Sequence, residues 1–84
     1  MSADRKVALI TGGSRGIGLG IARCLAAGGC DLAINGVREE AKVAGVLDEL
    51  RQSGAKVLYC RGDVARSEDR GSIIEQVKQV FGHL

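Results

Sequence analysis

Four glycines lie close together near the start of the chain, at positions 12, 13, 16 and 18. They follow a run of strand-forming residues, Val7–Thr11, and an apolar helical pattern begins at Ile17. A strand, a glycine turn and a helix N-terminus in this order direct free backbone N–H groups and the positive end of the helix dipole towards one point. Glycine also lets an anion approach the backbone, because no Cβ stands in the way. The stretch therefore predicts a phosphate-binding turn.

The spacing of these glycines separates several kinds of nucleotide-binding turn. A nucleotide-hydrolysing P-loop needs Lys followed by Ser or Thr after its last glycine, whereas Gly18 is followed by Leu19 and Gly20. The order G-x-x-x-G-x-G at positions 12, 16 and 18 also differs from the G-x-G-x-x-G dinucleotide fingerprint. The glycines therefore carry a strong signal only because a strand precedes them and a helix follows them.

The elements that must position this turn alternate along the chain. Apolar runs predict strands at 7–11, 31–35 and 56–61, and helical periodicity predicts helices at 17–27, 39–53 and 67–81, the last with Ser67 as its N-cap. On the first helix, Ile17, Ile21 and Leu25 recur every four residues, with Ala22 and Ala26 beside them as small contacts. This β-α-β-α-β-α order predicts one α/β domain over residues 1–84, which is half of a doubly wound fold with a parallel three-stranded sheet.

Composition excludes several classes of function. A net charge of +2, spread over twelve basic and ten acidic residues, and only two aromatic side chains argue against nucleic-acid binding. The cysteines at 24, 30 and 60 are odd in number and show no C-x-x-C spacing, so we expect small buried apolar residues in a reducing compartment and no metal site. No apolar run reaches membrane-spanning length. These features favour a cytoplasmic protein without a membrane partner.

Three segments carry a family resemblance. The run Thr11-Gly-Gly-Ser-Arg-Gly-Ile-Gly18 resembles the T-G-x-x-x-G-x-G cofactor motif of the classical short-chain dehydrogenases/reductases. Asp63-Val64 is similar to the adenine-contacting pair of that family, and Phe81-Gly-His-Leu84 to the lead-in to its fourth strand. The resemblance covers essentially all 84 residues and is strongest to bacterial 3-oxoacyl-carrier-protein reductases. It implies that the chain is the Rossmann-type cofactor half of a longer oxidoreductase.

The resemblance also implies a nicotinamide dinucleotide and assigns roles in holding it. The three motif glycines would let the backbone approach the pyrophosphate, with Ser14 and Ile17 in contact through the turn. Asp63 would accept a hydrogen bond from the adenine amino group, and Val64 would lie near the ring. With the two arginines discussed next, the expected cofactor-binding residues are Gly12, Ser14, Arg15, Gly16, Ile17, Gly18, Arg38, Asp63 and Val64.

Charge favours NADP over NAD as the cofactor. NAD-preferring folds place an acid near the end of the second strand, where it binds the ribose 2′-hydroxyl and repels a 2′-phosphate. Here that strand ends at Asn35-Gly36, and the next acid is Glu39. Arg15 and Arg38 are both placed to meet a phosphate, which the planar guanidinium suits. A solvated loop charge is the alternative interpretation of Arg38.

Catalytic residues are not expected within this chain. Tyr59 has Asp63 four residues later, so it does not form the Tyr-x-x-x-Lys pair of the family, and no nucleophile or carboxylate pattern surrounds His83. The resemblance implies that the catalytic residues would follow Leu84. The complete protein would then be a homo-oligomeric NADP-dependent oxidoreductase that transfers a hydride between nicotinamide and a carbonyl or alcohol substrate, with 3-oxoacyl thioesters as the nearest class.

Two interpretations besides such an enzyme remain open. The first is a non-catalytic, truncated nucleotide-binding module. A methyltransferase-type turn is a weaker alternative, because it would prefer an acid where Gly36 stands. In the strand order 3-2-1-4, the strand at 7–11 would lie at an open edge, and the third helix alone would cover one face. We therefore expect the 84-residue chain to be marginally stable or prone to aggregation.

Overall fold

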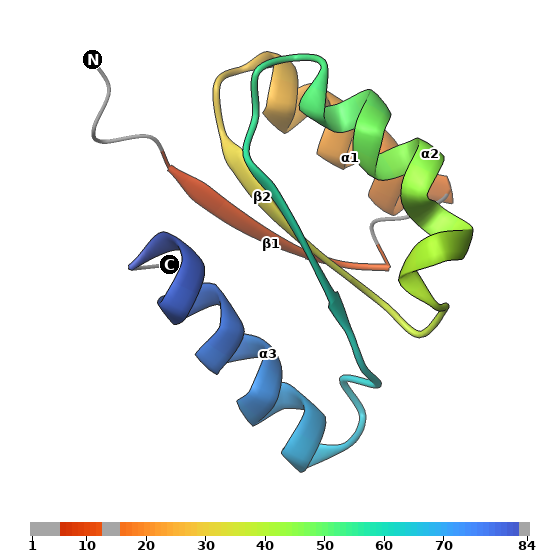
Figure 1. The fold of residues 1–84 in the computed structure, drawn as a ribbon, viewed down its shortest axis with the longest axis vertical. Helices are drawn as coiled ribbons and strands as arrows, with labels where there is room; N and C mark the ends of the chain where they lie inside the picture. The colour runs from red at the N-terminus through yellow and green to blue at the C-terminus, as the bar shows by residue number, and fades with distance from the viewer. Residues whose placement is uncertain (1–5, 13–15, 83–84) are drawn as a thin grey trace.

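The computed structural model describes residues 6–12 and 16–82 (Figure 1). Its elements, in chain order, are β1 (Val7–Thr11), α1 (Gly16–Ala27), β2 (Asp31–Gly36), α2 (Glu40–Arg51), β3 (Val57–Arg61) and α3 (Ser67–Phe81). The predicted β-α-β-α-β-α order is confirmed, and each boundary lies within two residues of the expected one. None of the helices in these two ranges has the length and apolar character that crossing a membrane requires.

The sheet is parallel and has the order β1-β2-β3, so β2 lies in the centre and β1 at one edge. Its register pairs Ile10 with Ile34 and Ile34 with Tyr59. The central strand is apolar on both faces, as a parallel sheet covered by helices requires, and residues 32–35 are all buried. Because all three strands run the same way, their carboxyl ends meet at the same end of the sheet.

Helices cover both faces of the sheet, as expected. Figure 1 shows α1 and α2 on one face and α3 on the other. The larger core cluster lies under α1 and α2, and the smaller one joins Ala33 and Cys60 to Ile73 and Val77 of α3. On the α3 side, Leu9 of β1 is only partly buried. The incomplete cover expected for this face is therefore present.

The buried face of α1 differs from the expected one. Ala22 is fully buried and Ala26 is 3% exposed, whereas Ile17 is 85% and Ile21 49% exposed. The isoleucines and the alanines of this helix both repeat every four positions. The alanines, with the smaller side chains, face the sheet. Alanine lets the helix axis lie close to β1 and β2, which an isoleucine stripe would prevent. The expected isoleucine stripe is therefore wrong, and Leu25 alone of that set packs against the core.

The cysteines also differ from one another in burial. Cys60 lies in the core and Cys30 is partly buried, but Cys24 is exposed on α1. The expectation of three buried cysteines is therefore wrong for Cys24. Burial raises the pKa of the Cys60 thiol, which keeps it a neutral, apolar core group.

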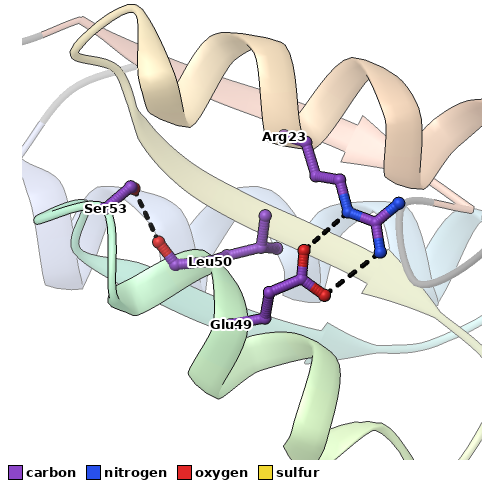
Figure 2. A network of polar contacts seen from close by, with 4 residues as sticks. All are labelled: Arg23, Glu49, Leu50 and Ser53. Atoms are coloured by element: carbon purple, nitrogen blue, oxygen red, sulfur yellow. Dashed lines mark hydrogen bonds and ion pairs between the residues drawn. The ribbon is translucent and has the colours of Figure 1, made fainter.

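An ion pair joins α1 to α2 at the surface (Figure 2). Arg23 donates two hydrogen bonds to Glu49, at 2.6 and 3.1 Å, and close by Ser53 Oγ donates to Leu50 O at 2.7 Å. The hydrogen bond and charge of Arg23 hold the pKa of Glu49 below its usual value. Any stability from this pair is present at neutral pH and lost as pH falls through that lowered pKa. Both side chains are about half exposed, so the pair orients the two helices and adds little stability.

Candidate functional site

The carboxyl ends of the three strands surround a hollow of about 330 Å³. In open α/β sheets, ligands bind at this end of the strands. The volume lies near the lower limit of about 300–1,000 Å³ for small-molecule pockets, so it suits one nucleoside rather than a whole dinucleotide. The hollow is lined by Thr11, Gly12, Asn35, Gly36, Val37, Arg38, Gly62, Asp63 and Val64.

Gly12 forms the β1 side of the hollow and shows why glycine stands there. Its φ of +65° lies in the left-handed region, and its N–H donates to Asn35 O at 2.8 Å. Among the residues that the structure describes, and leaving its chain neighbours aside, a Cβ added at Gly12 would meet no heavy atom within 4 Å. The residue therefore serves the backbone conformation, and the space beside the turn stays open for a ligand. This open backbone surface fits a phosphate-bearing group.

Asn35 fastens the β2 and β3 sides of the hollow together. Its side chain is 3% exposed, and Nδ2 donates to Cys60 O at 2.9 Å and to Gly62 O at 3.0 Å. The two amide hydrogens thereby fix the carboxyl end of β3 against β2. From the sequence alone, Asn35 shows only that no acid stands near the end of β2. A polar side chain at the end of an apolar strand was the available signal for this role.

The segment between β2 and α2 brings Arg38 to the hollow. Arg38 is partly buried, and Val37 beside it is 64% exposed. Tyr59 OH donates to Arg38 O at 2.7 Å, and Arg61 Nε donates to Val37 O at 3.1 Å. Tyr59 is packed in the core, as predicted, but its hydroxyl also holds this segment. Arg38 thus lines the hollow at the strand ends, and its contact with a ligand stays a prediction.

The first turn of α3 holds the segment that contains Asp63 and Val64. Asp63 N donates to Asp69 Oδ2 at 2.8 Å, and Arg70 Nη1 donates to Val64 O at 2.7 Å. Arg66 is the N-cap and makes no side-chain cap hydrogen bond, so the expected Ser67 cap is wrong by one residue. Asp69, one turn further on, accepts the hydrogen bond that fixes the Asp63 backbone.

The structure brings part of the predicted site together. Gly12, Arg38, Asp63 and Val64 line one hollow, although they come from three separate connections. Gly16, Ile17 and Gly18 form the start of α1 and do not line it. Ser14, Arg15 and His83 lie outside the described residues. Among the described residues, Arg38 and Asp63 are the charged residues of this lining.

The family model described as short chain dehydrogenase matches residues 6–84. A curated relative, the A-factor type gamma-butyrolactone 1′-reductase (1S-forming) of Streptomyces virginiae, is 42% identical over 79 residues. Those residues are 94% of this chain and 30% of the relative.

Two solved structures carry different forms of the nicotinamide cofactor. A 3-oxoacyl-[acyl-carrier protein] reductase from Brucella melitensis in complex with NAD is 46% identical, with a TM-score of 0.85 over 94% of this chain and 30% of that one. L-sorbose reductase from Gluconobacter frateurii, complexed with NADPH and L-sorbose, is 35% identical, with a TM-score of 0.85 over 93% and 30%. The chain thus spans less than a third of the length of these proteins.

Proposed function

The chain belongs to the short-chain dehydrogenase family, and on that premise we propose that residues 1–84 form the nucleotide-binding half of an NADP-dependent reductase. When bound, the reduced cofactor would donate a hydride from its nicotinamide ring to a carbonyl carbon, and the oxidised cofactor would accept one from an alcohol carbon. A 3-oxoacyl thioester is the substrate class we propose, supported by 46% identity to a 3-oxoacyl-[acyl-carrier protein] reductase. In this proposal the chain binds and orients the adenosine side of the cofactor.

The observation that carries the proposal is the position of Arg38 at the strand ends. Arg38 lines the same hollow as Gly36, where an NAD-preferring fold would carry an acid near the end of β2. The sequence places no acid between Asn35 and Arg38, so a guanidinium at the end of β2 favours a 2′-phosphate over a 2′-hydroxyl. Asp63 would accept a hydrogen bond from the adenine amino group, with Val64 against the ring. Arg15 and Ser14, in the glycine turn, would complete the phosphate contacts together with Gly16, Ile17 and Gly18.

A second candidate function is a nucleotide-binding module without catalysis. Within its 84 residues the sequence contains no Tyr-x-x-x-Lys, so the function that these residues themselves support is nucleotide binding. Tyr59 does not replace that pair, because its hydroxyl already donates to Arg38 O and burial raises its pKa. Both candidate functions include cofactor binding. Because neither gives this chain a catalytic pair, we expect no turnover of NADPH by the 84-residue chain with 3-oxoacyl substrates.

The test of the proposal is a calorimetric titration of the chain with NADP⁺ and with NAD⁺. One charge-assisted contact to the 2′-phosphate predicts binding of NADP⁺ about tenfold tighter or more. Equal affinities would contradict NADP preference, and no binding of either dinucleotide at millimolar concentration would contradict nucleotide binding itself.

A further inference from the structure

The segment that carries Arg38 is held from a neighbouring strand. Tyr59 OH donates to Arg38 O at 2.7 Å, and Arg61 Nε donates to Val37 O at 3.1 Å. Residues 59 and 61 are two positions apart along β3, so their side chains point to the same face of the sheet. Two successive peptide carbonyls are thereby fixed immediately before α2 begins at Glu40.

The two anchors differ in rigidity. Tyr59 is 6% exposed and belongs to the core cluster that also contains Val43 and Leu47 of α2. Its ring is immobilised by packing, so its hydroxyl presents a fixed donor at the strand end. Arg61 is exposed, and its hydrogen bond to Val37 O is more open to competition from water. We therefore expect the tyrosine to contribute more to the position of this segment.

The charge state of Tyr59 suits this role. Burial raises the pKa of its hydroxyl, while the positive charges of Arg38 and Arg61 act in the opposite direction. The net result is a neutral phenol that still carries its proton at neutral pH. It therefore donates to the Arg38 carbonyl over the whole range in which a nucleotide would bind.

We propose that Tyr59 is a positioning residue for recognition of the adenosine 2′-phosphate, because its hydroxyl fixes the Arg38 backbone, with Arg61 as a weaker second anchor. The inference rests on the proposed binding of NADP. An arginine on an unanchored segment would lose backbone as well as side-chain freedom when it met a phosphate. Anchoring the backbone in advance removes part of that cost and so raises the affinity for the phosphorylated ribose. Neither anchor needs to touch the ligand.

The test uses Tyr59→Phe, which keeps the buried ring and removes only the hydroxyl. The two probes are adenosine 2′,5′-bisphosphate and AMP, which differ in the 2′-phosphate, and their dissociation constants are measured by calorimetry. Loss of one hydrogen bond predicts about fivefold weaker binding of the bisphosphate, with AMP affinity changed less than about twofold. If Tyr59 has a purely structural role, Tyr59→Phe would lower the melting temperature and leave the ratio of the two affinities unchanged.

A matched pair of arginine variants separates backbone anchoring from loss of charge. Arg51 Nη2 donates to Val57 O at 3.0 Å, which is a similar bond at the opposite end of β3. Arg61→Gln and Arg51→Gln therefore remove the same charge and a similar hydrogen bond, and Arg51→Gln also removes an exposed ion pair with Asp48 at 3.3 Å. We expect Arg61→Gln to reduce the preference for the bisphosphate about twofold and Arg51→Gln to leave it unchanged. Equal reductions in both would overturn the role of Arg61.

The outcomes also distinguish this inference from the proposal on which it rests. If the unmodified chain prefers the bisphosphate but Tyr59→Phe keeps the full preference, the positioning role is wrong and NADP binding stands. If the unmodified chain binds both probes equally or binds neither, both the NADP proposal and the positioning role are overturned.

Discussion

Asn35→Asp is expected to unfold most of the chain at neutral pH. The Asn35 side chain is 3% exposed, and its amide donates to two carbonyl oxygens, those of Cys60 and Gly62. A carboxylate there has no hydrogen to donate and places a buried negative charge against both oxygens. A buried charge without a partner costs about 3–5 kcal/mol. An 84-residue domain has a total stability of roughly 4–13 kcal/mol. We expect this chain to lie near the lower end, where such a loss leaves little or no net stability. Urea unfolding followed by circular dichroism measures it.

The pH dependence of this loss identifies its cause. Burial and the two carbonyl oxygens raise the pKa of an aspartate at this position above its unfolded value of about 3.9. The charge penalty is therefore absent below about pH 4 and grows as pH rises. Asn35→Leu, similar in size and uncharged, is the matched control and is expected to lose about 1–3 kcal/mol at every pH. A gap between the two variants that does not change with pH would contradict the explanation.

Arg38→Ala is expected to weaken NADP⁺ binding by about 10- to 100-fold, which corresponds to one charge-assisted contact of about 1.5–3 kcal/mol. Arg38 lines the hollow, and Asp63 is the other charged residue of that lining. Of the two cofactors only NADP⁺ carries the 2′-phosphate that the guanidinium would meet, so NAD⁺ affinity should change less than about twofold. Fluorescence titration of both dinucleotides measures the two losses.

The control for this substitution is Arg51→Ala. Arg51 ends α2, and its hydrogen bond reaches Val57 at the start of β3, away from the hollow. Arg51→Ala removes the same charge as Arg38→Ala, so the two variants weaken any general attraction between the chain and an anion equally. Equal losses for NADP⁺ and NAD⁺ in Arg38→Ala would show that Arg38 does not recognise the 2′-phosphate.

The fold follows from local patterns that the sequence displays directly. Apolar runs that end at glycines predict the three strands, and the alternation with helices places their carboxyl ends together. Arg38 and Asp63 each lie two residues beyond a strand end. Charge and position suggested the role of Arg38, whereas the role expected for Asp63 came from the family resemblance. What such patterns predict well is the location of the strand ends, and therefore of the hollow.

Contacts between distant residues could not be predicted in the same way. Asn35 reaches Cys60 across 25 positions, and Tyr59 reaches Arg38 across 21. Nothing in a local pattern indicates which side chain meets which carbonyl across that separation. The prediction of the buried face of α1 was wrong for a related reason, because its isoleucines and alanines have the same spacing. The distance between helix and sheet decides between them, and it depends on the whole fold.

The central claim is that the carboxyl ends of β1, β2 and β3 hold the adenosine side of a nicotinamide dinucleotide. Backbone amide chemical shifts of the chain, followed by NMR during titration with NADP⁺, test it most directly. We predict the largest changes at Gly12, Gly36, Arg38 and Val64, and almost none at Asp31 and Lys56, where Lys56 N donates to Asp31 at the opposite end of the sheet. Changes centred on Asp31 and Lys56, or none at saturating NADP⁺, would contradict the claim.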